Sequence, residues 1–329
     1  VLGAAALSQE AVNAFSSVVT RLLHSVTLPQ GFSPKQFALS LAYHFAVCRP
    51  SMEPIANSIA SITSPLFPIA ESSSVETVLS LIESSAQSYR SHVQSASSVI
   101  ASHLIASLSS GSSSSSDSKF VIITHSSSGT VYRSILELAT ANKLESLYIT
   151  ESRTASEGIT LATKLRSQLP TTCAITVIPD CSIFTLLDHL SVSHSSSQLR
   201  VVVGADGVFP DGSFSNKIGT RPLLIAARDS TVPVSVLFDT FKISGSSVHP
   251  LFSEVSTTPW WALPSSSSQT SMDVSAWDPV FENVPASLVS SSSLLSFITE
   301  KGKLNLADIA AHSQQMAMDL SFLISPTPL

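Results

Sequence analysis

The spacing of apolar residues divides the chain into two parts. In the first 110 residues, apolar side chains recur at intervals of three and four, which is the period of amphipathic helices. Pro34 fits the first turn of a helix, and Glu76 places a carboxylate near a positive helix end. This part is therefore predicted to be an N-terminal helical domain covering residues 1–110. Its four predicted helices span residues 5–26, 34–47, 54–62 and 75–108.

Beyond residue 119 the pattern changes to short, continuous apolar runs. Each of four runs leads into a polar loop and then a helix-like stretch, and a fifth run follows. Val- and Ile-rich runs that alternate with helices are typical of a parallel sheet covered on both faces, with right-handed crossovers. The sequence therefore predicts an α/β fold class, with a parallel-sheet domain over residues 111–329. The five predicted strands cover residues 120–124, 146–150, 174–178, 200–205 and 232–238.

Two segments interrupt this regular pattern. The Ser- and Gly-rich stretch 109–119 is predicted to be a flexible surface loop. The stretch around Trp260 and Trp261 is predicted to be an irregular excursion. After it, residues 294–320 predict a last strand and a closing helix.

Composition and charge narrow the classes of partner. The chain has 329 residues, of which 43% are hydrophobic and 12% charged, so it holds enough apolar material for a sizeable core. Its net charge of −6 argues against a basic surface for duplex nucleic acid. No apolar run approaches the about 20 residues of a spanning helix, and residues 1–6 lack the basic region of a signal peptide. We therefore expect no direct nucleic-acid partner and no membrane.

Cysteine usage indicates a reducing compartment. The three cysteines are Cys48, Cys173 and Cys181. Their odd number argues against a disulfide framework, and no two of them have the spacing of metal ligands. No Asn opens a glycosylation motif. The sequence thus predicts a cytoplasmic protein without a metal site.

Polar residues that can bind ligands follow three of the predicted strands. Residues 125–130 follow the first strand, 151–158 the second and 206–220 the fourth. In an open parallel sheet, ligands bind beyond the carboxyl ends of the strands. We therefore expect these three loops to lie along one edge of the sheet and to form a binding site.

The residue types in these loops suit a phosphorylated small molecule. Helix N-termini offer backbone N–H groups and a positive dipole end to oxyanions, and the Ser-Ser-Gly stretch 127–129 lies at such a junction. Lys217 adds a positive charge, and Arg153 can bind a phosphate or carboxylate with two hydrogen bonds. Asp206 can accept from sugar hydroxyls, or transfer protons if burial raises its pKa.

Each of these features also has a purely structural interpretation. The stretch 126–130 could only cap a helix, and Glu151 with Arg153 could form a structural ion pair. His125 fits a packed, hydrogen-bonded histidine better than a base. Lys217 could be a solvated surface charge. Three polar junctions on one edge favour a ligand site more than any one of them does alone.

Residues 204–220, GADGVFPDGSFSNKIGT, resemble the signature of the initiation factor two-B family. Further stretches resemble segments of that family in the same order: CRPSMEPIANSI, VIITHSSSGTV, ITESRTASEGITLATKL, WDPVFENVP and FITEKGKL. The family comprises alpha, beta and delta regulatory subunits of the exchange factor for translation initiation factor two, and isomerases of methylthioribose-1-phosphate and ribose-1,5-bisphosphate. Because the similarity covers nearly all of the chain, it implies an N-terminal helical domain followed by a Rossmann-like α/β domain that mediates dimerisation.

The resemblance also implies roles for single residues. In the isomerases, an Asp at the place of Asp206 and a Cys at the place of Ser126 carry the proton chemistry, so both residues are catalytic only if this chain is an isomerase. A Ser hydroxyl is a poor acid or base at neutral pH unless a neighbour activates it. One Arg of the isomerase phosphate site is replaced by Leu2, whereas a second is kept as Arg49.

Two main hypotheses of function follow from the resemblance, and a third, a diverged stand-alone metabolite sensor, is not separated from the first by the sequence. Glu157 stands where the isomerases tend to have Gln, which favours a non-catalytic, alpha-like regulatory subunit with a residual pocket for a sugar phosphate or a nucleotide monophosphate. Such a protein needs no cofactor and is expected as a homodimer or within an initiation factor exchange complex. The alternative is an aldose-ketose isomerase of a ribose-1-phosphate-type sugar, in which His125 assists Ser126. The residues predicted to bind the ligand are Arg49, Ser127, Ser128, Gly129, Arg153, Glu157, Asn216 and Lys217.

Overall fold

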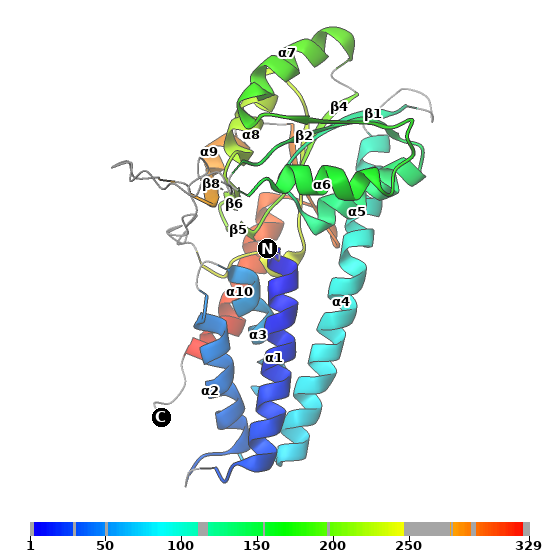
Figure 1. Ribbon diagram of the computed structural model, residues 1–329. Helices are drawn as coiled ribbons and strands as arrows, with labels where there is room; N and C mark the ends of the chain where they lie inside the picture. The colour runs from blue at the N-terminus through cyan, green and yellow to red at the C-terminus, as the bar shows by residue number, and fades with distance from the viewer. Residues whose placement is uncertain are drawn as a thin grey trace, which may run out of the picture.

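The computed structural model shows a mixed α/β protein in which a layer of helices stands against one end of a largely parallel sheet (Figure 1). It describes residues 3–28, 31–49, 52–110, 118–153, 155–195, 198–246, 277, 279–290 and 294–324. Most of the Ser-rich loop and both Trp260 and Trp261 lie outside these residues. Within the described ranges, no helix is long and apolar enough to cross a membrane.

The four N-terminal helices agree with the sequence prediction to within two residues at each end. α1 (Ala4–Ser25) begins beside the sheet and runs away from it, and α4 (Val75–Ser110) runs back (Figure 1). α2 (Pro34–Val47) starts where the sequence places a helix start, because Ser33 and Gln36 form a reciprocal capping box. α3 (Glu53–Thr63) is buried along most of its length.

The last helix of the described chain joins the helical layer. α10 (Leu306–Ile324) contacts α2 and α3, and Leu323 is buried in the same cluster as Phe15 and Ile59. The Phe322 ring stacks on Phe67 with 4.5 Å between ring centroids. The two ends of the chain therefore share one core, and the division of the chain at residue 110 stays a prediction.

Seven strands form the main sheet in the order β10-β9-β7-β4-β1-β2-β3. Six of them are parallel, and β10 pairs antiparallel to β9. The five strands predicted from the sequence are all present, and the predicted last strand is β9. The strand bounds are β1 (Phe120–His125), β2 (Leu144–Thr150), β3 (Ala174–Ile178), β4 (Leu199–Gly204), β7 (Val234–Leu237), β9 (Leu295–Thr299) and β10 (Gly302–Leu304).

Alternating side chains of the central strands point to opposite faces of the sheet. Val121 and Ile123 lie in one core with α7 (Ile183–Ser193) and α8 (Thr220–Asp229). Phe120 and Ile122 lie in another core with α4, α5 (Gly129–Thr140) and α6 (Glu157–Arg166). Because helices cover both faces, the strands have the continuous apolar runs seen in the sequence.

A second, small antiparallel sheet was not expected from the sequence. β5 (Gly207–Val208) pairs with β6 (Phe214–Lys217), which pairs with β8 (Phe281–Val284). The sequence prediction treated residues 206–220 as a loop, because the partner strand β8 lies far along the chain and leaves no local signal. The remaining short elements are η1 (Ser64–Leu66), η2 (Asp180–Ser182), η3 (Thr240–Lys242) and α9 (Ala286–Ser290).

Candidate functional site at the carboxyl ends of the strands

The strand order brings the three predicted loops to adjacent positions. β1 lies between β4 and β2, and all three strands are parallel. The chain leaves β1 towards β2 and β3, and later returns to the other side of β1 as β4. Such a switch point opens a crevice at the carboxyl ends of the strands. Residues of the loops after β4, β1 and β2 therefore meet at one edge.

A single carboxylate connects these loops. Glu157, the first residue of α6, accepts a hydrogen bond from Ser126 Oγ at 2.5 Å. It also forms an ion pair with Lys217 Nζ at 3.1 Å. The Lys217 and Glu157 side chains are only 18% and 16% exposed, so water screens the pair weakly. Lys217 Nζ also lies 4.6 Å from the centroid of the Phe281 ring. We refer to Ser126, Glu157 and Lys217 as the Glu157 group.

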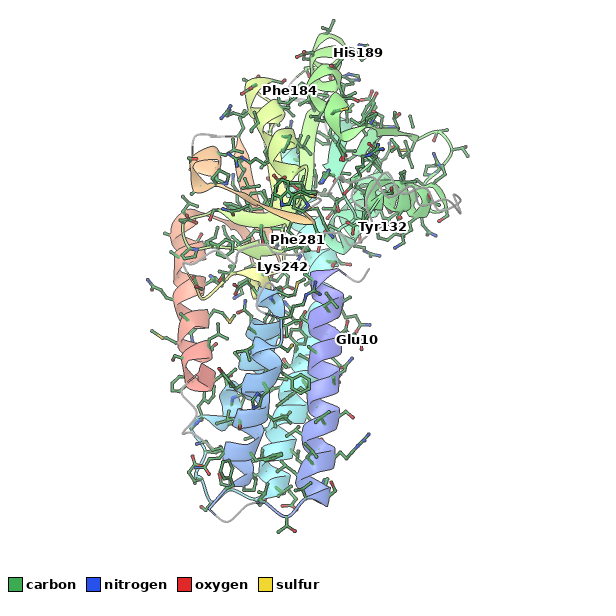
Figure 2. The ribbon with its side chains drawn as sticks, turned by 60° about the vertical axis from the view of Figure 1, so that its left-hand side comes forward. Glu10, Tyr132, Phe184, His189, Lys242 and Phe281 are labelled. Atoms are coloured by element: carbon green, nitrogen blue, oxygen red, sulfur yellow. The ribbon has the colours of Figure 1, made fainter. Side chains whose placement is uncertain are left out.

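Asp206 lies beside this group, directly after β4. Its backbone N–H donates to the Ser215 carbonyl, which fixes the start of the small sheet. Burial raises the pKa of the Asp206 carboxyl, while the nearby charges of Lys242 and Lys217 act in the opposite direction. Lys242 is itself buried and donates to the Ala205 carbonyl at 2.5 Å, where the sheet meets the helical layer (Figure 2). A carboxyl with a raised pKa can exchange a proton closer to neutral pH.

His125 is held as a packed histidine. Its Nε2 lies 2.7 Å from the Ile218 carbonyl, and its Nδ1 lies 2.5 Å from Thr150 Oγ1. A carbonyl only accepts, so Nε2 carries the proton and the neutral ring accepts at Nδ1. Burial also lowers the pKa of His125, which favours that neutral form. Both ring nitrogens are therefore bonded away from Ser126, and the proposed assistance of Ser126 by His125 is not seen in this structure.

Gly219 makes this packing of His125 feasible. Its φ of +105° lies in the region that favours glycine, and a Cβ atom there would come within 2.5 Å of His125 Cε1. The Gly-Thr pair that opens α8 therefore brings backbone directly against the imidazole ring.

Two sets of backbone N–H groups that could hold a phosphate are bonded to carboxylates of the chain itself. Asp180 accepts from the N–H groups of Ser152 and Arg153 at 2.8 and 2.9 Å. Glu282 Oε1 accepts from Gly219 and Arg221 at the start of α8, at 2.7 and 2.8 Å. The N–H groups of Gly219 and Arg221 at the start of α8 are therefore already bonded to a carboxylate of the chain.

The loop after β1 caps a helix, and its place in the fold is also compatible with the predicted ligand site. Ser128 caps α5, because its Oγ accepts from Val131 N at 3.4 Å, and it also lies against Gly204 at the end of β4. Ser127 is half-buried and Gly129 is exposed at the start of the helix. These residues thus stand at the switch point, where a ligand could reach them.

Backbone strain is concentrated at the same edge. Ser126, Ser152 and Ser156 have φ values of 64°, 53° and 52°, in the left-handed region that residues with a side chain adopt rarely. Ser126 makes the contact with Glu157, and Ser156 directly precedes Glu157 in the sequence. Conformations of this kind cluster at ligand sites.

The remaining predicted residues lie further from Glu157 or have structural partners. Asn216 is buried and donates to Thr220 Oγ1 at 2.9 Å. Arg153 is 58% exposed and pairs with Glu151 at 3.3 Å, which agrees with the structural ion-pair interpretation. Arg49 is half-buried between α2 and α3, and its carbonyl accepts from Met52 N. Leu2 lies outside the described residues.

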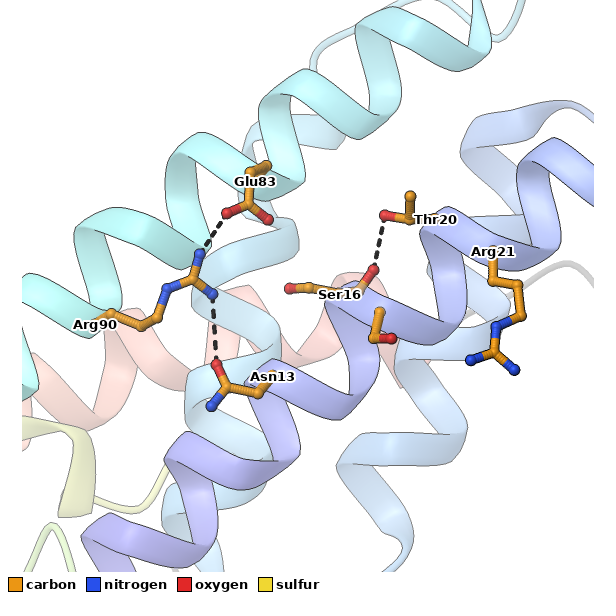
Figure 3. A pocket seen from close by; sticks show the side chains of 7 residues that line it. Asn13, Ser16, Thr20, Arg21, Glu83 and Arg90 are labelled. Carbon is orange, nitrogen blue, oxygen red and sulfur yellow. Dashed lines mark hydrogen bonds and ion pairs between the residues drawn. The ribbon is translucent and has the colours of Figure 1, made fainter.

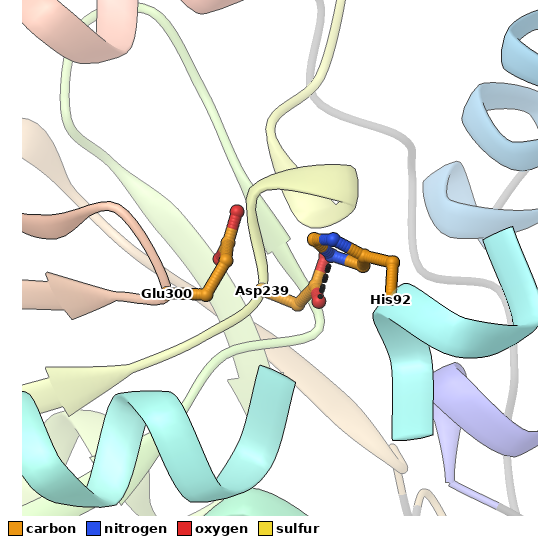
Figure 4. Close-up of side chains that lie close together, drawn as sticks. All are labelled: His92, Asp239 and Glu300. Atoms are coloured by element: carbon orange, nitrogen blue, oxygen red, sulfur yellow. Dashed lines mark hydrogen bonds and ion pairs between the residues drawn. The ribbon is translucent and has the colours of Figure 1, made fainter. Parts of the chain in front are cut away.

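One group of potential metal ligands lies elsewhere, where α4 meets the sheet. Ligand atoms of His92, Asp239 and Glu300 lie within 4.8 Å of one another (Figure 4). His92 Nε2 lies 2.7 Å from Asp239 Oδ2, and Glu300 accepts from the N–H and hydroxyl of Thr240. His92 and Asp239 thus bond to each other, whereas Glu300 is bonded to Thr240.

The model of the Initiation factor 2 subunit family matches residues 2–306 of the chain. The chain belongs to this family. The resemblance seen in the sequence is thereby confirmed.

Relatives of both functional types match parts of this family member. A putative translation initiation factor eIF-2B subunit 2-like protein of Pyrococcus furiosus is 32% identical over 126 residues, which cover 38% of this chain and 42% of the relative. The methylthioribose-1-phosphate isomerase of Populus trichocarpa is 29% identical over 201 residues, which cover 56% of this chain and 49% of the relative. The matched part spans less than half the length of either relative.

Solved structures show the same fold. The Pyrococcus horikoshii OT3 translation initiation factor eIF-2B has a TM-score of 0.64 at 22% identity, with 92% of each chain covered. The tetrameric eIF2B-beta2-delta2 complex from C. thermophilum gives 0.62 at 13% identity, covering 94% of this chain and 89% of that chain. The 5-methylthioribose 1-phosphate isomerase from P. horikoshii OT3 gives 0.52 at 16% identity, covering 94% and 87%. The predicted α/β fold class is confirmed.

Three charged residues of the site, Asp180, Lys242 and Glu282, were missed in the sequence. Asp180 follows β3, whose loop was not among the three singled out. Lys242 lies in the segment that follows β7, so a search of the carboxyl ends of all predicted strands would have found it. Glu282 lies on β8 and gives no local signal, because only the pairing of β8 with β6 brings it to α8.

Proposed function

We propose that this chain is a non-catalytic, alpha-type regulatory member of its family that binds a sugar phosphate or a nucleotide monophosphate beside the Glu157 group. It would act in the cytoplasm, as a homodimer or within an exchange complex for translation initiation. The similarity to a putative translation initiation factor eIF-2B subunit 2-like protein and to eIF2B subunit structures of the same fold supports this role.

One observation carries the non-catalytic part of the proposal. The hydroxyl of Ser126, which stands where the isomerases have a Cys, donates to the Glu157 carboxylate. A carboxylate is too weak a base to activate an aliphatic hydroxyl at neutral pH, and both nitrogens of His125 are bonded elsewhere. Ser126 thus lacks a contacting base suited to proton transfer.

The ligand-binding part rests on the charges around Asp206. Lys217 at the end of β6 and Lys242 at the end of η3 bring two ammonium groups near Asp206. Their positive charges act to lower the pKa of its carboxyl. A phosphate that replaces Glu157 as the partner of Lys217 would gain a charge-assisted contact. The hydroxyl groups of Ser127 and Ser128 lie on the neighbouring loop and suit the sugar or phosphate oxygens.

A sugar-phosphate isomerase is the second candidate, and the state of Asp206 favours it. Burial raises the pKa of this carboxyl, as proton transfer to and from a sugar carbon requires. The isomerase reading then needs a second proton carrier, and Ser126 alone is a weak one.

Calorimetry and NMR on the purified protein separate these two functions. Ribose-1,5-bisphosphate and methylthioribose-1-phosphate are each added, the heat of binding is recorded, and the ketose product is followed over time. We expect heat without ketose. Formation of ketose that stops in the Asp206→Asn variant would identify an isomerase instead.

The binding site itself is tested with Lys217→Ala. Loss of a charge-assisted phosphate contact of about 1.5–3 kcal/mol should weaken binding by about tenfold to a hundredfold. The matched control is Lys303→Ala, which removes one exposed charge on the edge strand β10. Equal affinities of the parent and Lys217→Ala would refute the site.

A further inference from the structure

A second polar cavity lies in the helical layer, away from the strand ends. It opens between α1 and α4 and has a volume of about 440 Å³ (Figure 3). Its lining is rich in hydrogen-bond donors, with two Arg side chains and three hydroxyl groups. The residues of α1 that line it are Asn13, Ser16, Ser17, Thr20 and Arg21, and those of α4 are Glu83 and Arg90.

Helical spacing explains how this polar lining arises. Positions 13, 17 and 21 are four residues apart, as are positions 16 and 20, so these residues form one stripe along α1. Positions 83 and 90 are seven apart, which places them on one face of α4 two turns from each other. Two polar stripes therefore face each other where α1 and α4 contact.

Ser16 is the unusual member of this lining. It belongs to the buried face of α1 together with Val12 and Val19, a face whose other buried polar residue, Ser8, is hydrogen-bonded to Tyr89. The residue is only 7% exposed, and its hydroxyl oxygen has no hydrogen-bond partner among the residues that the structure describes. Its side chain extends from α1 towards α4, on the side where Arg90 lies (Figure 3). Buried hydroxyls nearly always have a partner, so this one indicates a group that is bound there.

The charges around Ser16 suit an anion. Arg90 bonds to the Glu83 carboxylate and to Asn13 Oδ1, the latter at 3.4 Å, and its side chain is 25% exposed. Glu83 is 62% exposed, so its ion pair with Arg90 is weak and can be exchanged for another anion. Arg21 is exposed at the other end of the cavity. The two Arg and one Glu leave a net positive lining.

We infer that this cavity is a second ligand site, which binds a small phosphorylated metabolite by its phosphate. The donors come from two helices and from several directions, which matches a tetrahedral phosphate better than a planar carboxylate. Arg90 takes two phosphate oxygens in place of Glu83, and the Ser16 hydroxyl donates to a third. The cavity is larger than a phosphate ion, and its outer hydroxyls, those of Ser17 and Thr20, face the rest of the metabolite.

The test uses the full chain carrying Lys217→Ala, so that binding at the strand ends is weakened separately. Ribose 5-phosphate, inorganic phosphate and ribose are titrated by calorimetry and by NMR of ¹⁵N-labelled protein. We expect saturable binding of ribose 5-phosphate with shifts of the amide signals of Ser16, Ser17 and Arg90. Ser16→Ala should weaken this binding about tenfold to a hundredfold.

The unliganded protein provides an independent readout. Ser16→Ala removes a buried hydroxyl that has no partner, so its melting temperature should equal or exceed that of the parent. A loss of affinity together with unchanged stability distinguishes a ligand contact from a structural role. Arg90→Gln should also weaken binding, whereas Arg228→Gln, a matched change on α8, should leave it within about twofold.

Several outcomes would overturn the inference. If neither ribose 5-phosphate nor inorganic phosphate bound saturably, the site would be refuted. An unchanged affinity for ribose 5-phosphate in Ser16→Ala would refute it as well. Binding of inorganic phosphate as tight as that of ribose 5-phosphate would refute the metabolite and leave a simple anion site. Because the strand-end site is altered only through Lys217, failure of one site does not imply failure of the other.

Discussion

Glu157 holds together the three loops that converge at the strand ends. Its carboxylate accepts a hydrogen bond from the Ser126 hydroxyl, after β1, and forms an ion pair with the Lys217 ammonium at the end of β6. Glu157 is itself the first residue of α6. The start of a helix stabilises a negative charge, so the position suits a carboxylate without a ligand. The same charge opposes a phosphate at Lys217.

This opposition leads to a prediction for Glu157→Gln. The amide oxygen can still accept from Ser126, while the negative charge is lost and Lys217 becomes available to a phosphate. We expect affinity for sugar phosphates to rise about tenfold, because the repulsion between like charges is removed. Calorimetry measures the change, with Glu145→Gln, at the opposite end of β2, as the control. A lower affinity in Glu157→Gln would mean that the carboxylate itself binds the ligand.

The residues at this site show what sequence alone can provide. The strand ends could be located from apolar runs, so Ser126, Glu157 and Lys217 were found as candidates. Their mutual contacts could not, because hydrogen-bonding partners depend on side-chain directions set by the left-handed backbone of Ser126. The N–H groups at α8 looked free in the sequence, since their partner Glu282 comes from a strand more than sixty residues away.

At the scale of elements, local patterns predicted the helices and parallel strands well. The period of a helix and the apolar run of a buried strand are local signals, so α1 to α4 and β1 to β4 were found close to their bounds. The small sheet of β5, β6 and β8 depends on pairing between distant segments. The position of α10 against α2 and α3 depends likewise on tertiary packing, which a single sequence does not display.

The docking of α10 can be tested by two neighbouring residues. Leu323 is 1% exposed in the helical core, whereas Phe322 is 56% exposed and stacks on Phe67. Leu323→Ala should lower the free energy of unfolding by about 2–5 kcal/mol, and Phe322→Ala by about 0.5–1.5 kcal/mol. Urea unfolding followed by circular dichroism gives both values. Equal effects would show that α10 is not anchored through Leu323.

His92 links α4 to the junction between β7 and η3, and this contact should depend on pH. Its hydrogen bond to Asp239 is the main cause that raises the pKa of His92; Glu300 adds to this, and burial and Lys301 oppose it. A raised histidine pKa means stability that is fully present below the unfolded value of about 6.5 and is lost as the pH rises through the folded value.

The variant His92→Gln therefore should destabilise the protein more at pH 6 than at pH 8.5, by a difference on the order of 1 kcal/mol. Urea unfolding at the two pH values measures it, and His24→Gln, an exposed histidine near the end of α1, is the control. A difference that grows with pH would have the wrong sign for an ion pair with Asp239.

At the scale of the whole molecule, α4 connects the helical layer to the sheet. Its first half contributes Val78 and Ile82 to the helical core, and its second half contributes Ile100 and Leu104 to a sheet core. A helix of 36 residues spans about 54 Å at 1.5 Å per residue. Unfolding of one core therefore removes a packing surface from the other.

We expect one cooperative unfolding transition for the two layers. Ile82→Ala and Ile100→Ala should each lower the same melting temperature, because each leaves a cavity in a core that contains α4. Differential scanning calorimetry makes the measurement, with Val99→Ala, an exposed position on α4, as the control. Two separate transitions, each moved by only one of the variants, would show that the layers unfold independently.

The carboxylates of Asp180 and Glu282 have a consequence for which anions the site accepts. Each is tethered to the N–H groups that it occupies, so its effective concentration there is on the order of millimolar or above. Small anions in solution must compete against that concentration and gain little by binding. A larger ligand that also reaches Lys217 recovers the difference through its additional contact. In the proposed site, the tethered carboxylates would therefore disfavour small common anions and favour ligands that make several contacts.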